Sequence, residues 1–81
     1  MREIFQKIID TKLSMISNDY IDLNSGKIHR EAGGYPGNNH RMPVCCEVMY
    51  NNMKGSDYVL SAPPKGKGAT LNIRYFKINH K

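Results

Sequence analysis

The chain has 81 residues, too few for more than one domain, and carries a formal net charge of +5 that favours anionic partners. Hydrophobic residues make up 40% of the sequence, which is typical of a folded globular protein. No run of about 18 apolar residues is present, so composition excludes a membrane-spanning helix. We treat residues 1–81 as a single domain.

A domain of this size buries only about 60–65% of the surface of its unfolded chain, so we expect marginal stability. The sequence has only two Cys and no obvious set of metal ligands, so disulfides and metal binding offer little extra stability to so small a fold. We therefore expect a homo-oligomer. The N-terminal stretch MREIFQKIIDTK has charged residues where a signal peptide has a continuous apolar core. We therefore expect a cytoplasmic protein with no membrane partner.

The first predicted element is an amphipathic helix over residues 2–17. Its apolar side chains recur with helical spacing and form one stripe: Ile4, Phe5, Ile8, Ile9, Leu13 and Ile16. We expect this stripe to cover a small sheet. The alternative is that it pairs with the same helix of another copy and serves as an oligomerisation element.

Strands are predicted next. Residues 20–23 alternate in polarity, and Asn24-Ser25-Gly26 is a turn signal that leads into residues 27–31. We therefore interpret residues 20–31 as a hairpin. Residues 32–41 are predicted to be a loop.

A second helix is predicted from about Pro43 to Lys54. Proline is tolerated at the first helical position, where its missing N–H would be unpaired anyway. The residue before a proline is pushed out of the α region, so Met42 is the expected N-cap. Gly55 suits the left-handed position that follows a helix.

Cys45 and Cys46 are adjacent in this predicted helix. Neighbouring cysteines rarely bond each other, because they cannot reach ordinary disulfide geometry. On a helix their side chains point about 100° apart, so they do not chelate one ion together. We interpret one or both as small buried hydrophobic residues. A reactive thiol and a metal ligand are the alternatives.

Residues 57–62 and 70–78 are predicted to form a strand pair around a long turn, because the second segment is rich in residues with strand propensity. The predicted element order is α-β-β-α-β-β. This order indicates an α+β fold, in which a small antiparallel sheet carries one or two helices on one face.

The glycine-rich loop ahead of the second helix is the first candidate site. A helix N-terminus exposes unpaired N–H groups and carries partial positive charge, and nearby glycines let the backbone approach an anion closely. The candidate ligand-binding residues of this loop, with Tyr35 available for stacking, are Gly33, Gly34, Tyr35, Gly37, Asn38, Asn39, His40 and Arg41. Neither the GxxxxGK[ST] nor the GxGxxG spacing is present. An ordered connecting loop is the alternative.

A second candidate is the Lys-Gly loop at residues 63–70, PPKGKGAT. Lys65 and Lys67 alternate with glycines, a combination that suits phosphate or a nucleic-acid backbone. Arg30 would complete the pocket, from the same subunit or a neighbouring one. A solvated hairpin loop is the alternative.

Catalysis is less well supported by the residue types. In a strand, His29 and Glu31 would share one side, and His40 adds a second histidine. A metal-dependent nuclease needs carboxylates or histidines that converge from several elements, yet the acidic residues after residue 31 are Glu47 and Asp57 alone. We therefore expect no catalytic residue, no metal and no cofactor.

These features predict a non-enzymatic protein that binds a phosphorylated small molecule, such as a nucleotide or a nucleotide-derived signal. In size and chemistry, though in no motif, the chain looks like the compact phage proteins that bind nucleotide-derived immune signals. That likeness implies sequestration of the ligand by an oligomer, and the high Asn, Lys and Ile content fits an AT-rich genome, bacterial or phage. The alternative is a basic nucleic-acid-binding module whose loops follow a phosphodiester backbone. A second alternative is a small His-dependent nuclease or hydrolase.

Overall fold

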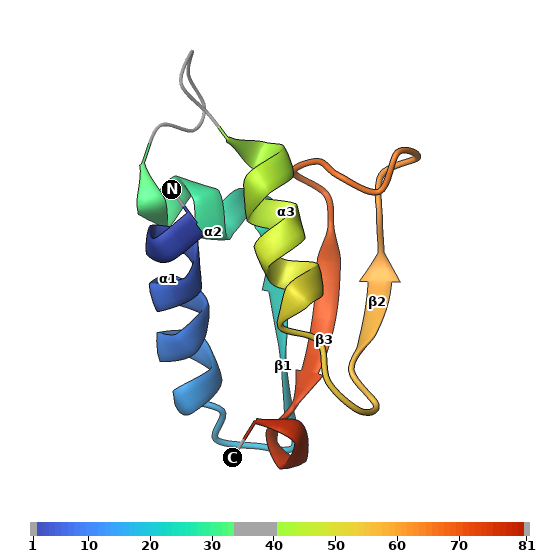
Figure 1. Cartoon of the computed structure of the whole chain (residues 1–81). Helices are drawn as coiled ribbons and strands as arrows, with labels where there is room; N and C mark the ends of the chain where they lie inside the picture. Colours follow the sequence, from blue (N-terminus) through green and yellow to red (C-terminus); the bar gives the residue numbers. More distant parts are fainter. Residues whose placement is uncertain (1, 34–40, 81) are drawn as a thin grey trace.

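The structure, a computed structural model, describes residues 2–33 and 41–80 (Figure 1). Along the chain the elements are α1 (Arg2–Ser14), β1 (Tyr20–Asn24), α2 (Ser25–Ala32), α3 (Met42–Asn51), β2 (Tyr58–Ser61), β3 (Asn72–Phe76) and the 3-10 helix η1 (Lys77–Asn79). Within these residues the fold is α+β, with three α-helices and a small three-stranded antiparallel sheet. None of the helices among the described residues is long and apolar enough to span a membrane.

The sheet has the strand order β1-β3-β2, so β3 is central and pairs with both neighbours in antiparallel fashion. Leu23 of β1 lies opposite Ile73 of β3. The β2–β3 pairing contains a register shift between Val59 and Ser61. The two C-terminal strands confirm the predicted strand pair, and a long loop (residues 62–71, the β2–β3 loop) joins them.

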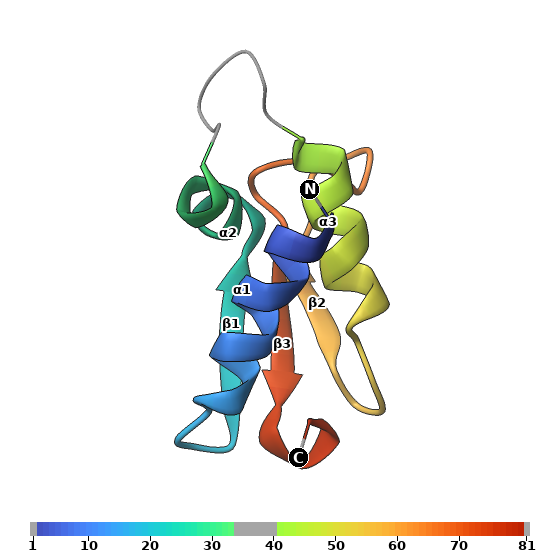
Figure 2. The same ribbon diagram turned by 60° about the vertical axis from the view of Figure 1, so that its left-hand side comes forward.

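Figure 2 shows α1 and α3 on the same side of the three strands. Along β3, Ile73 and Tyr75 are fully buried toward the helices, whereas Arg74 between them points to the other face and is partly exposed. The fully buried apolar part of the core is formed by Phe5, Ile9, Ile28, Cys45, Cys46, Met49, Leu71, Ile73 and Tyr75. Phe5 and Ile9 of the predicted stripe therefore pack within the chain, while the pairing of this helix with another copy stays a prediction.

α1 is shorter than the predicted helix over residues 2–17. The Ser14 hydroxyl donates to the carbonyl of Thr11 at 2.7 Å, and such local bonds compete with continued helix. Ile16 lies beyond the end of the helix and is still buried. Ile4, at the other end of the predicted stripe, remains 44% exposed.

The hairpin expected over residues 20–31 is wrong in its second half, which forms α2. Asn24 acts as a helix N-cap, and its Oδ1 accepts the N–H of Lys27 at 3.0 Å. The Ser25 hydroxyl also donates to the carbonyl of Gly68 at 2.5 Å, a contact remote in sequence. The observed order is therefore α-β-α-α-β-β instead of α-β-β-α-β-β, so the described residues contain three α-helices where the predicted order has two.

α3 confirms the predicted second helix, with shifted ends. Arg41 is the N-cap, whereas Met42, which was expected there, lies in the first turn because its apolar side chain is buried in the core. The helix ends three residues before the predicted boundary, and the Asn52 side chain donates to the carbonyl of Val48 at 2.7 Å across its last turn. Gly55 has a φ of 54°, but it lies within the turn to β2.

Cys45 and Cys46 are free and fully buried, which confirms their interpretation as small buried residues. Burial, together with the neighbouring Cys46, raises the pKa of Cys45 to about 12. A thiol with so high a pKa stays protonated at neutral pH, and the thiolate is the reactive form. The burial of both side chains argues against the reactive-thiol alternative.

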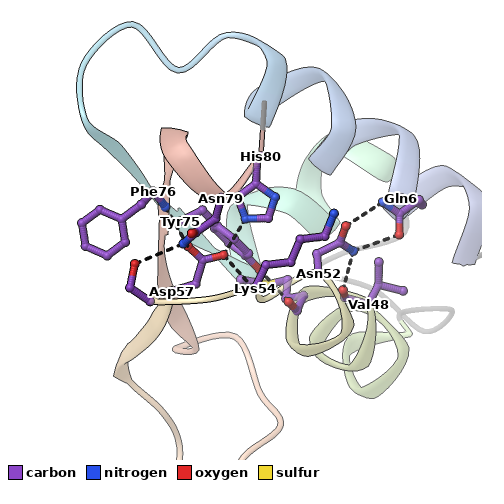
Figure 3. Close-up of polar contacts among 11 residues, drawn as sticks. Gln6, Val48, Asn52, Lys54, Asp57, Tyr75, Phe76, Asn79 and His80 are labelled. Carbon is purple, nitrogen blue, oxygen red and sulfur yellow. Dashed lines mark hydrogen bonds and ion pairs between the residues drawn. The ribbon is translucent and has the colours of Figure 1, made fainter.

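Asp57 ties the turn after α3 to the end of β3 (Figure 3). Its side chain is fully buried, and its carboxylate accepts the backbone N–H groups of Lys54 at 2.9 Å and Phe76 at 2.8 Å. Asn79 Nδ2 donates to it at 2.7 Å, and His80 Nε2 lies 2.5 Å away. Burial alone would raise the pKa of this carboxyl, but the hydrogen bonds outweigh burial and hold the pKa below its ordinary value.

Candidate functional site

His29 joins α2 to the beginning of α3. Its side chain is fully buried, and its Nε2 accepts the backbone N–H of Arg41 at 2.5 Å. Glu31, which was expected on the same side of a strand as His29, is exposed and pairs with Lys12 at 2.9 Å. The His29–Glu31 pair that a strand would have allowed is therefore not formed, because in a helix these two residues point in different directions. His29 has a structural role in positioning α3.

Five of the predicted ligand-binding residues lie within the described ranges: Arg30, Gly33, Arg41, Lys65 and Lys67. All five are exposed. The end of α2, the start of α3 and the β2–β3 loop, which carry them, lie at the same end of the molecule (Figure 1). Gly33 has a φ of 94°, a conformation that favours glycine. The other predicted residues lie outside the described ranges: Gly34, Tyr35, Gly37, Asn38, Asn39 and His40.

The β2–β3 loop is fastened to α3. Three side chains of α3 hold three consecutive loop residues, in the pairs Tyr50–Gly66, Glu47–Lys67 and Cys46–Gly68. The Tyr50 hydroxyl donates to the carbonyl of Gly66 at 2.5 Å, and the N–H of Gly68 points at the sulfur of Cys46 at 3.2 Å. Gly66 has a φ of 78°, so the turn favours glycine there. The loop therefore has a defined position beside α3, in contrast to a freely solvated hairpin.

The side of α3 that is not fully buried carries a narrow line of side chains, which we call the outer stripe: Pro43 and Asn51, which are exposed, and Val44 and Glu47, which are half-buried. Val44, Glu47 and Asn51 follow one another at helical i, i+3 and i+7 spacing. The opposite face of the helix is buried in the core. The outer stripe lies between Arg2, at the start of α1, and Lys67, in the β2–β3 loop, both of which reach Glu47.

Glu47 is held between these two cations. Arg2 Nη2 lies 2.7 Å from its Oε2, and Lys67 Nζ lies 3.2 Å from its Oε1. The hydrogen bonds and charges of Lys67 and Arg2 hold the pKa of the Glu47 carboxyl below its ordinary value. An ionised carboxylate offers about four accepting positions, so two such partners leave room for a further donor.

A hollow of about 450 Å³ lies in another part of the molecule, between α1, β1 and α2. It is lined by Ile8, Thr11, Lys12, Met15, Ile21 and Glu31. None of the predicted ligand-binding residues contributes to this hollow. The described cations of the candidate site instead lie on an outer surface.

An aromatic and charged cluster on the uncovered face of the sheet was missed by the sequence reasoning. Arg74 makes two hydrogen bonds to Asp22, at 2.8 and 2.9 Å, and its guanidinium lies 3.9 Å from the centre of the Tyr20 ring. Tyr75, which neighbours Arg74 in sequence, is buried on the other face. Side chains alternate between the two faces along a strand, so the neighbours Arg74 and Tyr75 lie on opposite faces. The cross-strand partners of Arg74 are remote in sequence.

Comparisons of the chain with protein-family models, with curated proteins and with solved structures found no match. A function must therefore be argued from the arrangement of particular side chains.

Proposed function

We propose that the chain is a basic nucleic-acid-binding module of the helix-turn-helix type, in which α3 enters the major groove of duplex DNA. One observation carries the proposal: α2 and α3 are consecutive, mutually packed helices, and the hairpin that follows is fastened beside the second one. In helix-turn-helix proteins the second helix of the pair lies in the groove while the first crosses the backbone. The β2–β3 loop would act as an adjoining wing.

The contact between His29 and Arg41 supports this assignment. It fixes the start of α3 against the end of α2 although the connector, residues 33–41, is longer than the three or four residues usual in such motifs. The N-terminal residues of a recognition helix are the ones that reach base edges. A buried anchor at this position would keep Val44 and Glu47 correctly placed for that role.

Exposed cations flank the outer stripe of α3. Arg41 lies at the start of the helix, Arg2 on the side of α1, and Lys65 and Lys67 on the side of the β2–β3 loop. Cations on both sides of a groove-binding helix suit phosphates of the two DNA strands, and each phosphate that is neutralised releases a counterion.

The binding of a phosphorylated small molecule is the second candidate. Exposed Arg30, Gly33 with its positive φ, and Arg41 adjoin the glycine-rich connector, and they would form part of a phosphate cradle. A nucleotide or nucleotide-derived signal would be held there without turnover. The third candidate, a His-dependent nuclease, is weakened because His29 is buried and uses Nε2 to accept the Arg41 N–H. A cytoplasmic location and homo-oligomerisation remain predictions.

The test is a titration of fluorescent ligands by anisotropy over a series of salt concentrations. A 20-base-pair duplex should bind, with affinity falling by about 0.9 log units per log unit of salt for each phosphate contact. Lys65→Ala and Arg41→Ala should each reduce that slope by about 1. Lys77→Ala removes another exposed cation, in η1 at the opposite end of the molecule, and should leave the slope unchanged.

Failure of the duplex to bind at low salt would contradict the proposed function. If nucleotides or cyclic nucleotides then raise the melting temperature and are recovered intact, the second candidate is favoured. If metal-dependent loss of substrate is seen, the third is favoured.

A further inference from the structure

Glu47 is an unexpected residue on a surface proposed to bind phosphates. It occupies the middle of the outer stripe of α3, where a lone carboxylate would repel phosphate oxygens. The structure compensates its charge with two cations from different elements, Arg2 of α1 and Lys67 of the β2–β3 loop. The side chain is still 36% exposed, so the carboxylate remains accessible between them.

We infer that Glu47 is a specificity-determining residue that accepts a hydrogen bond from the N4 amino group of cytosine in the major groove. The inference rests on the proposed function. In that groove cytosine presents an amino donor, and glutamate or aspartate is the side chain that accepts from it. Adenine also presents an amino group, but its neighbouring N7 is an acceptor that would repel a carboxylate.

The position of Glu47 on α3 and the contacts of its carboxylate with Arg2 and Lys67 fit this role. It lies at i+3 from Val44 and at i−4 from Asn51, so its neighbours on the outer stripe would meet adjacent base pairs. Each carboxylate oxygen contacts one cation, and each retains a second accepting position. Because Arg2 and Lys67 hold the carboxylate in place before any base arrives, less conformational freedom is lost on binding.

This arrangement predicts that affinity and specificity change in opposite directions. Glu47→Ala releases Arg2 and Lys67 for phosphates, so affinity for random-sequence duplex should rise about threefold to tenfold and the salt slope should steepen by about 1 to 2. At the same time the preference for cytosine at one position should fall by about 10-fold. Glu47→Gln should move that preference toward adenine, because glutamine pairs with adenine N6 and N7.

The experiment is selection from a randomised duplex library with the full chain, followed by anisotropy on the enriched and random sequences. Glu31→Ala removes the same charge from α2 and should leave the selected sequence unchanged. Lys67→Ala should lower affinity for all sequences and, because Arg2 still holds Glu47, should weaken the cytosine preference less than Glu47→Ala does. Melting temperatures of all variants show whether each one is folded.

The outcomes separate the two proposals. If the wild-type chain binds no duplex, the proposed function fails and this inference falls with it. If the wild-type chain binds duplex and enriches a sequence, but Glu47→Ala and Glu47→Gln enrich the same bases, the function stands and the role of Glu47 is overturned. If the wild-type chain binds duplex without enriching any sequence, the inference is likewise overturned. Loss of the cytosine preference in Glu47→Ala and its replacement by adenine in Glu47→Gln support it.

Discussion

The backbone N–H of Arg41 donates to Nε2 of His29 at 2.5 Å, and this bond links the last turn of α2 to the start of α3. The acceptor is fully buried, with its ring 5.0 Å from that of Phe5. A buried side-chain acceptor that caps the first N–H of a helix fixes both the position and the direction of that helix. The candidate interface on α3 therefore depends on a residue that does not reach the surface.

Substitution of His29 should destabilise the fold. His29→Ala removes a buried ring and its bond to Arg41, so the free energy of unfolding should fall by about 2–4 kcal/mol. Urea denaturation followed by circular dichroism measures this change. Lys27→Ala, an exposed substitution in the same helix, is the control and should cost less than about 0.5 kcal/mol. Equal stability of the two variants would refute the anchoring role.

Removal of the Tyr50 hydroxyl should loosen the β2–β3 loop. Tyr50→Phe deletes the bond to the carbonyl of Gly66 and should lower the free energy of unfolding by only about 0.5–1.5 kcal/mol. The local effect should be larger: amide hydrogen exchange of residues 65–70 should accelerate, because the loop then opens without global unfolding. Tyr58→Phe, whose hydroxyl contacts Arg74 on the other face, is the matched control. Unchanged exchange in Tyr50→Phe would show that the loop is not held by this bond.

Asp57 should make stability dependent on acid pH. Its folded-state pKa lies below the unfolded value of about 3.9, so its contribution is fully present above that value and is lost as pH falls through the folded pKa. Asp57→Asn should therefore be less stable than wild type by about 1–3 kcal/mol at pH 6, and the gap should shrink by pH 3. Denaturation at both pH values measures the gap. A gap that is independent of pH would mean that the charge of Asp57 contributes nothing.

The two cysteines should be inert in the folded protein. Cys45 and Cys46 are fully buried, and the pKa of Cys45 is raised to about 12, so neither thiol should react with a thiol-specific reagent at pH 8. Two thiols should become reactive in guanidinium. Rapid modification of one thiol under native conditions would contradict the burial.

Most of the fold could be predicted because the apolar spacing of α1 and α3 extends over several turns and the last two strands have strong strand propensity. α2 could not be predicted in the same way. The triplet Asn24-Ser25-Gly26 suits a hairpin turn as well as a helix start. Residues 27–31 are too few to distinguish the helical spacing of apolar residues from the alternation typical of a strand. What distinguishes them is the bond from Ser25 to Gly68, which no local pattern reveals.

The candidate site was only partly predictable for the same reason. Exposed cations in glycine-rich loops were found from composition, and the structure places the described ones at one end of the molecule. The partner of Lys67 is Glu47, twenty residues away, and the burial of His29 follows from α2 being a helix. Such pairings depend on tertiary packing, which spacing along one sequence does not encode.

The most direct test of the central claim is a backbone NMR titration of the chain with duplex DNA. The largest amide shift changes should fall on residues 44–51 of α3 and 65–70 of the β2–β3 loop, while β1 and β3 should change little. Shift changes confined to the uncovered sheet face around Tyr20 and Arg74, or no changes with duplex at saturating concentration, would contradict it.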